Sequence, residues 1–183
     1  MKKVLLSFVL LIIFISNAFS NTEVINALKE GGKLVFIRHA YAPGGGDPEN
    51  FNVNDCSTQR NLNSAGIEQA KRIGIIFKDN NIPIDQVLSS EWCRCKDTAK
   101  NAFGEFKTFN ALNSFFSSKF AKNRDQQMKD LKSFVKNWNG KENIIFVTHY
   151  VVIGEALNTN VSSGEIAVTD KSFNLIGTIE TKY

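Results

Sequence analysis

The chain has 183 residues, of which 43% are hydrophobic and 22% are charged, and 15 of them are phenylalanines. This composition predicts a globular protein with a large apolar core and excludes a disordered chain, and the length predicts one domain once any targeting segment is removed. The formal net charge is only +4 and the lysines are scattered, which gives no electrostatic argument for nucleic-acid binding.

The first 20 residues have the pattern of a signal peptide. Two lysines precede an apolar stretch over residues 4–15, and an Ala-Phe-Ser tripeptide after it matches a small-x-small cleavage site. The apolar stretch is shorter than the about 20 residues that a membrane-spanning helix needs. We therefore predict a cleaved signal peptide over residues 1–20, one domain over residues 21–183 with no stable membrane span, and a periplasmic or secreted location. Cleavage removes two lysines and no acid, so the net charge falls from +4 to +2.

The chain contains three cysteines, Cys56, Cys93 and Cys95, which export would place in an oxidising compartment. An odd number leaves at least one thiol unpaired within the monomer. Cys93 and Cys95 are too close in sequence to bond comfortably, and a C-x-C pair without further cysteines is not a zinc signature. The sequence therefore predicts a bridge from Cys56 to either Cys93 or Cys95 and predicts no metal site.

The first half of the mature chain predicts a helix, a strand, a long loop and a second helix. A short amphipathic helix ends at Gly31, and the uninterrupted apolar run Leu34–Ile37 then predicts a fully buried strand. Residues 41–61 are rich in Gly, Asn, Asp and Pro and predict a loop of a length that is uncommon unless it is functional. Apolar residues at steps of three and four then predict a helix over residues 63–81, capped by Ser64.

The second half continues to alternate between strands and helices. The predicted elements are a strand (84–90), a helix (91–103), a third strand (106–112), an amphipathic helix (125–140), a strand (143–149), a helix (150–158) and an edge hairpin (164–170 and 172–181). Buried, non-alternating strands that alternate with helices predict an α/β fold, a three-layer αβα sandwich with a mainly parallel central sheet.

Both histidines of the chain come at the ends of buried strands. His39 follows Arg38 at the end of "LVFIRH", and His149 ends "NIIFVTH". Ligands bind beyond the carboxyl ends of the strands in such sheets, so we expect both imidazoles to meet in one cleft. Arg94 lies in the first turn of a predicted helix at the same edge, and Arg60 lies in the long loop. Imidazole and guanidinium groups in this number favour a tetrahedral oxyanion such as phosphate.

These groups can carry out phosphoryl transfer without a metal ion or a cofactor, because the guanidinium groups supply the positive charge. A neutral histidine can attack phosphorus and carry the phosphoryl group, while the second histidine and the arginines stabilise the charge on the oxygens. The predicted function is therefore hydrolysis of small phosphate esters through a phosphohistidine intermediate. No feature of the sequence identifies a particular ester or an oligomeric state.

Four segments, in order between Lys33 and Ile153, resemble the histidine phosphatase, or phosphoglycerate-mutase-like, superfamily. "LVFIRHA" is similar to its R-H-G strand end, "RNLNSAGIEQA" to its LT-x-x-G-x-x-QA helix start, "SSEWCRCKDTA" to its phosphate-binding arginine segment, and "VTHYVVI" to its second-histidine segment. The resemblance implies a phosphoglycerate-mutase-like fold. It implies His39 as the phosphorylated nucleophile, and it implies that the rest of the phosphate pocket consists of Arg38, Arg94 and His149. Arg60 is a weaker candidate for substrate binding.

The chain departs from the superfamily pattern at the general acid. Many members place a glutamate after the third strand, but no acidic residue lies between Glu105 and Asp125 in this chain. Asp47, Asp55 or Glu165 could protonate the leaving oxygen from a loop. We prefer Asp55, because it lies near Arg60 and a bridge at Cys56 would hold it. A site without an acid would favour substrates with good leaving groups.

Two alternative functions follow from the same residues. The missing acid leaves open a non-catalytic module that binds phosphorylated ligands in the same pocket. A phosphoglycerate-type mutase is the weaker alternative, because export argues against it and the chain is short for the insertions that shape a mutase pocket.

For each of these functions, we expect the loop 41–61 and the segment 113–125 to form the entrance of the cleft.

Overall fold

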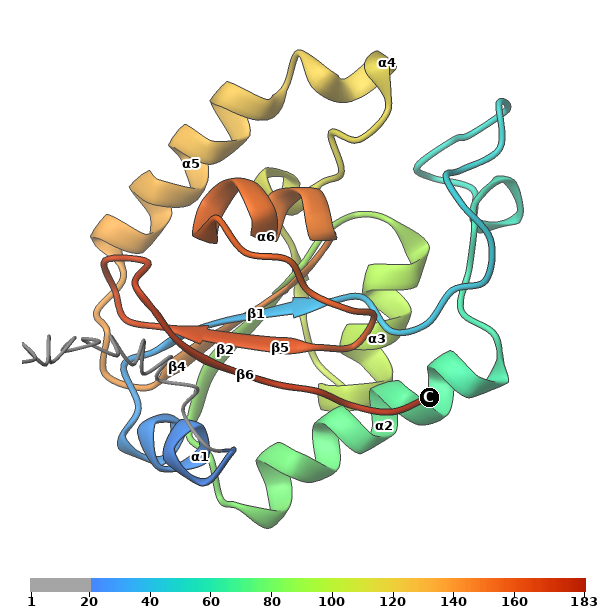
Figure 1. Ribbon diagram of the computed structural model, residues 1–183. Coiled ribbons are helices and arrows are strands. Elements are labelled where there is room, and N and C mark those ends of the chain that lie inside the picture. The colour runs from blue at the N-terminus through green and yellow to red at the C-terminus, as the bar shows by residue number, and fades with distance from the viewer. Residues whose placement is uncertain (1–20) are drawn as a thin grey trace, which may run out of the picture.

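The computed structural model describes residues 21–183, so the predicted signal peptide lies outside the described residues. The described part contains one six-stranded sheet with helices on both faces (Figure 1). The strands are β1 (Leu34–Arg38), β2 (Ile84–Ser89), β3 (Lys107–Thr108), β4 (Asn143–Thr148), β5 (Ile166–Thr169) and β6 (Leu175–Ile179). The α-helices are α1 (Asn21–Glu30), α2 (Ser64–Asp79), α3 (Cys93–Phe103), α4 (Ser118–Ala121), α5 (Arg124–Asn137) and α6 (Tyr150–Leu157). Two short 3₁₀ helices are η1 (Cys56–Thr58) and η2 (Asn110–Leu112).

The strand order in the sheet is β3-β2-β4-β1-β5-β6. The four strands from β3 to β1 are parallel, whereas β5 runs antiparallel to β1 and β6 antiparallel to β5. The prediction of a three-layer α/β fold with a mainly parallel sheet is therefore confirmed, with the predicted hairpin at one edge. No helix within residues 21–183 is long and apolar enough to cross a membrane.

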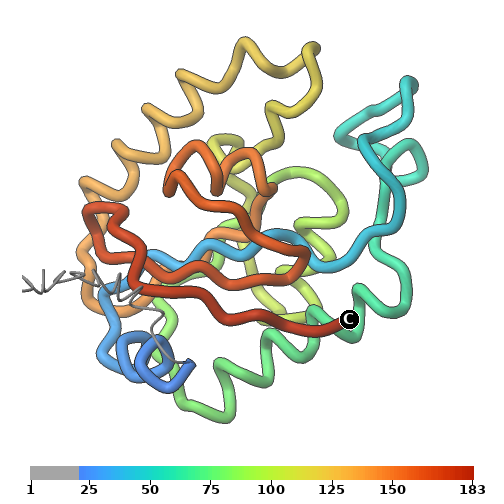
Figure 2. Tube along the Cα trace, viewed as in Figure 1, coloured from blue at the N-terminus to red at the C-terminus, as the bar shows by residue number. Residues whose placement is uncertain are grey.

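The absence of polar positions inside β1 follows from burial on both faces of the sheet. Val35 and Ile37 pack into a core with side chains of α1, α2 and α3, whereas Leu34 and Phe36 pack into a second core with α5 and α6. Figures 1 and 2 show these two helical layers on opposite sides of the sheet. A strand with one solvent-exposed face would have alternated between apolar and polar residues.

Two local predictions are wrong in detail. The third strand is reduced to the two residues of β3, because the chain turns into η2 directly afterwards. Helix α2 is capped by Asn63 rather than Ser64: the Asn63 side chain accepts a hydrogen bond from the backbone N–H of Gly66. Ser64 is already the first residue of the helix, so its hydroxyl cannot take the capping position.

The register of β1 and β4 places both histidines at the same edge. Arg38 lies opposite Thr148, and the backbone N–H of His39 donates to the carbonyl of Thr148 at 2.9 Å. On the other side, the N–H of Gly164 donates to the carbonyls of Arg38 and His39. The chain therefore leaves the sheet at His39 and His149 in adjacent strands, as the sequence predicts.

Candidate active site

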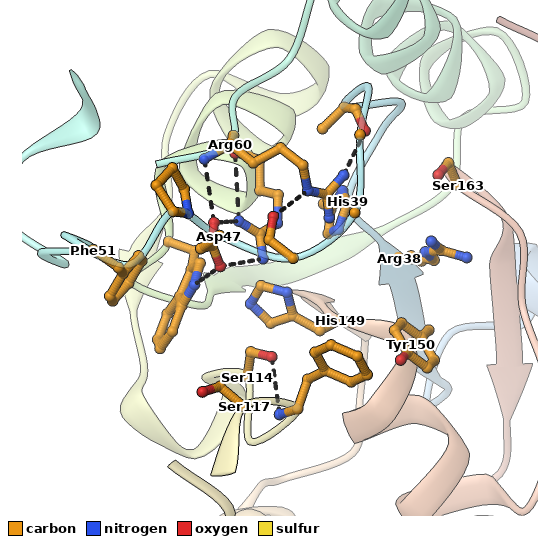
Figure 3. A pocket seen from close by; sticks show the side chains of 18 of the residues that line it. Arg38, His39, Asp47, Phe51, Arg60, Ser114, Ser117, His149, Tyr150 and Ser163 are labelled. Carbon is orange, nitrogen blue, oxygen red and sulfur yellow. Dashed lines mark hydrogen bonds and ion pairs between the residues drawn. The ribbon is translucent and has the colours of Figure 1, made fainter. Parts of the chain in front are cut away.

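A cleft of about 900 Å³ opens at the carboxyl edge of the parallel strands. His39, His149, Arg38, Arg60 and Arg94 all line it, and Figure 3 shows the two imidazoles facing the same space. The other walls come from the loop after β1 and from residues 114–120, which confirms the expectation that these segments form the entrance.

His39 is almost fully buried, with 2% of its surface exposed. Its Nδ1 lies 2.9 Å from the carbonyl oxygen of Ala40. Because a carbonyl oxygen can only accept, Nδ1 carries the proton and the lone pair of the neutral ring is on Nε2. Burial, reinforced by the positive charge of Arg94, holds the pKa of His39 well below its ordinary value. The ring is therefore neutral and nucleophilic at physiological pH.

His149 lies beside His39, with 5.5 Å between the ring centroids. Its Nε2 lies 2.9 Å from Ser90 Oγ and 3.5 Å from Cys95 Sγ. Burial and the charge of Arg94 also hold the pKa of His149 well below its ordinary value. The site thus contains two neutral imidazoles.

Arg94 makes a bidentate ion pair with Asp47, a contact that the sequence does not predict. Nη1 lies 2.6 Å from Oδ1 and Nη2 lies 3.1 Å from Oδ2. The same carboxylate accepts hydrogen bonds from the indole N–H of Trp92 at 3.0 Å and from the backbone N–H of Arg60 at 3.2 Å. Burial raises the pKa of Asp47, but the hydrogen bonds and charge of Arg94 outweigh it, so the pKa is lowered and Asp47 is a carboxylate.

The other two arginines differ in how firmly they are held. Arg38 donates from Nη1 to the carbonyl of Val161 at 2.8 Å and lies over the ring of Tyr150, 5.2 Å from its centroid. Its Nε is buried without a hydrogen-bond partner in the described residues. Arg60 donates from Nε to the carbonyl of Gly46 and from Nη1 to the carbonyl of Ala42, so it braces the loop in addition to lining the cleft.

Small and polar residues of two helices fix the chain beyond His39. The hydroxyl of Thr98 in α3 accepts from the backbone N–H of Ala40 at 2.9 Å and donates to the carbonyl of Arg94. In α2, a Cβ at Gly66 would lie 2.0 Å from the carbonyl oxygen of Tyr41, so only glycine permits this approach. These contacts give a structural reason for the Thr-Ala and Gly-x-x-Gln-Ala segments, residues 98–99 and 66–70.

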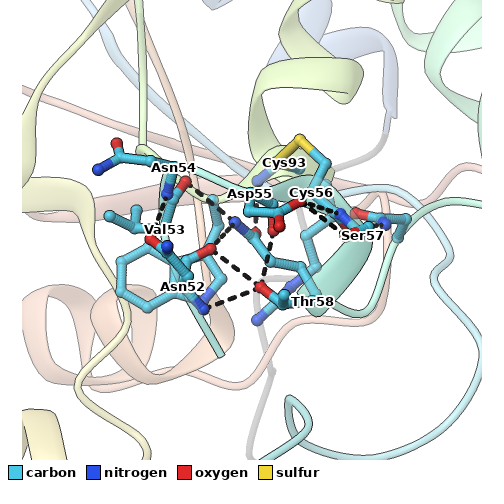
Figure 4. The surroundings of a disulfide bond; sticks show 12 residues. Asn52, Val53, Asn54, Asp55, Cys56, Ser57, Thr58 and Cys93 are labelled. Atoms are coloured by element: carbon cyan, nitrogen blue, oxygen red, sulfur yellow. Dashed lines mark hydrogen bonds between the residues drawn. A yellow bond between two sulfur atoms is a disulfide. The ribbon is translucent and has the colours of Figure 1, made fainter. Parts of the chain in front are cut away.

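A disulfide joins Cys56 to Cys93 and thereby ties the long loop to the start of α3, one residue before Arg94 (Figure 4). Of the two predicted pairings, the structure contains this one. Cys95 is buried in α3, and burial raises the pKa of its thiol to about 12, so it is not a thiolate nucleophile. Ser89 and Ser90 are fully buried and do not line the cleft.

The structure does not support the preferred acid, Asp55. That residue is exposed, caps η1 through a hydrogen bond to the N–H of Ser57 and lies outside the cleft (Figure 4). Glu165 is buried, accepts a hydrogen bond from the N–H of Ser162 and also lies outside the cleft. The acids that line the cleft are Asp47 and Glu49. Glu49 was not among the acids expected from the sequence, because the loop has no periodicity that shows where its side chains point.

Lowering the pH from about 7.5 to about 5.5 is expected to destabilise the fold through both buried histidines. Below about 6.5 an unfolded histidine binds a proton, whereas the folded ring, with its lowered pKa, does not. The free energy of unfolding should therefore fall as the pH falls, by up to about 1.4 kcal/mol per pH unit for each histidine. Urea unfolding of the wild type and of His149→Gln at both pH values measures how much His149 contributes to this change in the free energy of unfolding. An identical pH dependence in the two proteins would contradict a neutral, buried His149.

Within residues 21–183, no group of three or more His, Cys, Asp or Glu residues is arranged to hold a metal ion.

No protein-family model and no curated protein matches the sequence. Solved structures do match. The protein histidine phosphatase SixA in complex with tungstate superposes with a TM-score of 0.57 at 14% identity, over 82% of this chain and 96% of that chain.

Two further structures match similarly. A putative phosphohistidine phosphatase SixA from Agrobacterium tumefaciens has a TM-score of 0.54 at 20% identity, over 81% of this chain and 97% of that chain. A putative alpha-ribazole-5'-P phosphatase from Escherichia coli has a TM-score of 0.55 at 17% identity, over 75% of this chain and 90% of that chain. These likenesses confirm the fold that the four sequence segments predict.

Proposed function

We propose that this chain, which has the fold of the histidine phosphatases, is a phosphomonoesterase whose His39 carries the phosphoryl group. One observation supports this most strongly: the Nδ1 proton of His39 is fixed on the carbonyl of Ala40, which leaves a neutral Nε2 in a cleft lined by three arginines. The solved relatives, among them phosphatases for phosphohistidine and alpha-ribazole-5'-P, support phosphatase chemistry on this fold.

In the first step, the Nε2 lone pair of His39 attacks phosphorus, an N–P bond forms and the ester P–O bond breaks. Arg38 and Arg94 donate hydrogen bonds to the phosphoryl oxygens and stabilise the charge that they carry in the transition state. The hydroxyl of Ser90 donates to Asn113 Oδ1 at 3.1 Å, so Nε2 of His149 carries the ring proton and donates it to Ser90 Oγ, which holds the orientation of this second ring. The Nδ1–H of His39 stays on the carbonyl of Ala40 and holds the orientation of the ring.

In the second step, water attacks the phosphohistidine, the N–P bond breaks and inorganic phosphate leaves. The arginines stabilise the same equatorial oxygens in both steps, which is why splitting one displacement into two lowers the overall barrier. A screen of the purified mature chain on many phosphate esters tests the activity, and a variant at His39 tests the mechanism.

Arg94→Lys is expected to lower kcat/KM for an aryl phosphate at least about tenfold, which corresponds to about 1.4 kcal/mol of transition-state binding. Lysine keeps the charge but loses the planar fork that makes the bidentate contact. Steady-state kinetics measure the effect, with thermal unfolding to confirm the fold. Arg124→Lys is the matched control, since Arg124 is exposed and pairs with Asp125 at the surface. A wild-type rate in Arg94→Lys would show that the arginine only braces the loop.

A non-catalytic module that binds phosphorylated ligands is the second candidate. The lowered pKa of Asp47 favours it, because an ionised Asp47 cannot protonate a leaving group. Turnover of an activated aryl phosphate that requires His39 distinguishes the two functions. Binding of phosphate without any turnover would favour the module.

Export is part of the proposal. The signal-like pattern of residues 1–20 supports it, and so does the Cys56–Cys93 disulfide, since such bonds persist in oxidising compartments. Determination of the N-terminal residue of the protein recovered outside the cytoplasm tests this. We expect that residue to be Asn21; an intact Met1 would contradict cleavage.

A further inference from the structure

The carboxylate of Asp47 occupies the donors of Arg94 that a phosphate would need. Arg94 exposes only 4% of its side chain, its Nε is buried without a partner in the described residues, and both Nη atoms donate to Asp47. Asp47 is the more exposed member of the pair, at 18%, and both residues line the cleft. A phosphate therefore gains the bidentate contact with Nη1 and Nη2 of Arg94 only if Asp47 gives way.

We propose that the substrate phosphate displaces Asp47 from Arg94 and that Asp47 then serves as the general acid for the leaving oxygen. This proposal rests on the proposed phosphatase function. In the ligand-free cleft, the Asp47 carboxylate occupies the position proposed for the substrate phosphate, because the Arg94 guanidinium holds it through two hydrogen bonds.

Charge favours the exchange. Three arginines line the cleft, and within residues 21–183 Asp47 is the one carboxylate that makes an ion pair with any of them. A phosphate ester dianion carries more negative charge than a carboxylate and has the same planar, bidentate match to guanidinium. It therefore competes well for Arg94, and it gains contacts with Arg38 that Asp47 does not make.

The backbone before Asp47 is suited to movement. Asp47 follows the run Gly44–Gly46, in which Gly44 and Gly46 have φ angles of +89° and +71°. A Cβ at Gly45 or Gly46 would meet nothing within 4 Å, so this stretch is not packed against the core. The hydrogen bonds that hold Asp47 are side-chain contacts from Arg94 and Trp92 and one backbone contact from Arg60, all of which a rotation of the Asp47 side chain releases.

Displacement of Asp47 from Arg94 also allows Asp47 to take up the proton that a general acid needs. Burial raises the pKa of Asp47, whereas the hydrogen bonds and charge of Arg94 and the hydrogen bonds from Arg60 and Trp92, all of which the rotation releases, lower it. Once Arg94 binds the phosphate, the effect of burial persists and the neighbouring dianion adds to it, so Asp47 takes up a proton from solvent. The other charged or titratable groups that line the cleft are Tyr41, Glu49 and Arg60 in its own loop, and Arg38, His39, Lys119, His149, Tyr150 and Tyr183 on the other walls.

The chemistry then balances over the two steps. As His39 Nε2 attacks and the P–O ester bond breaks, the Asp47 carboxyl gives its proton to the leaving oxygen, which departs as an alcohol. Water then attacks the phosphohistidine and gives a proton to the Asp47 carboxylate, so the products are hydrogen phosphate and a neutral His39. When phosphate leaves, Asp47 returns its proton to solvent and pairs again with Arg94.

Tungstate tests the displacement without turnover, because it is a tetrahedral dianion that carries no proton of its own near neutral pH. Calorimetry of tungstate binding at about pH 7.5, in buffers of different ionisation enthalpy, measures the protons taken up. We expect the wild type to take up more protons than Asp47→Asn, and we expect Asp47→Asn to bind tungstate about tenfold more tightly, since the competing charge is gone. Asp55→Asn, in the same loop but outside the cleft, should match the wild type in both measurements.

Steady-state kinetics test whether Asp47 is the general acid. Asp47→Asn should lower kcat/KM for an alkyl phosphate by about 10² to 10⁴-fold and change the value for an activated aryl phosphate far less, because a phenol leaves with little protonation. A loss of alkyl-phosphate activity in Glu49→Gln instead of Asp47→Asn would overturn the assignment. So would equal proton uptake in the wild type and Asp47→Asn.

A crystal structure of the wild-type tungstate complex tests the displacement even if Asp47→Asn does not fold. We expect tungstate oxygens on the Nη atoms of Arg94 and the Asp47 carboxylate away from them. An Asp47 that still makes both contacts with Arg94 in that complex would overturn the proposal. Failure of the proposed function gives a different result, namely no His39-dependent turnover of any ester while the binding measurements still report on Asp47.

Discussion

His39→Ala is expected to lower turnover of an aryl phosphate by at least about 10⁴-fold, as loss of a nucleophile does in other covalent mechanisms. In the proposed mechanism, the neutral Nε2 of His39 forms the N–P bond, and neither a cysteine nor a serine near the cleft replaces it. Cys95 is a buried thiol with a raised pKa, and Ser89 and Ser90 lie outside the cleft.

The same variant should abolish trapping of the intermediate. Rapid quenching under alkaline conditions with a radiolabelled ester is expected to leave an acid-labile, base-stable label on wild-type His39. Ser89→Ala is the control, since Ser89 is fully buried and should not affect the label. Label on a serine or a cysteine would refute His39 as the nucleophile.

Removal of the disulfide is expected to lower the free energy of unfolding by about 2–4 kcal/mol. The bond joins residues separated by 37 positions and ties the loop 41–61, which carries Asp47 and Arg60, to the start of α3. The double variant Cys56→Ala/Cys93→Ala avoids new free thiols at the surface. Without the bond, the unfolded chain gains freedom and the loop is held only by its hydrogen bonds, so kcat/KM should fall together with stability.

Urea unfolding of the double variant and of the wild type with and without reductant measures this effect. The reduced wild type should resemble the double variant, because Cys95 is buried and takes no part in the bond. Equal stability of the oxidised and reduced wild type would contradict a structural role of the Cys56–Cys93 bond.

The core of the fold was predictable from short stretches of sequence. β1 and β4 are runs of apolar residues without alternation, which is the pattern that burial on both faces imposes. The amphipathic helix α5 and the glycine after α1 follow from equally local rules. The length of β3 was overestimated, because a strand at the sheet edge depends on pairing with its neighbour and the chain turns away after two residues.

The sequence by itself determined which candidate catalytic side chains meet, because parallel strands deliver their last residues to one edge of the sheet and both histidines end such strands. Tertiary structure decided what surrounds them. The path of residues 41–61 selects Cys93 as the partner of Cys56, turns Asp55 toward solvent and places Asp47 on Arg94. That loop has no hydrophobic periodicity, so nothing local specifies where its side chains point. Its conformation is set by contacts with α3, which is distant along the chain and meets the loop only once the sheet has brought the two together.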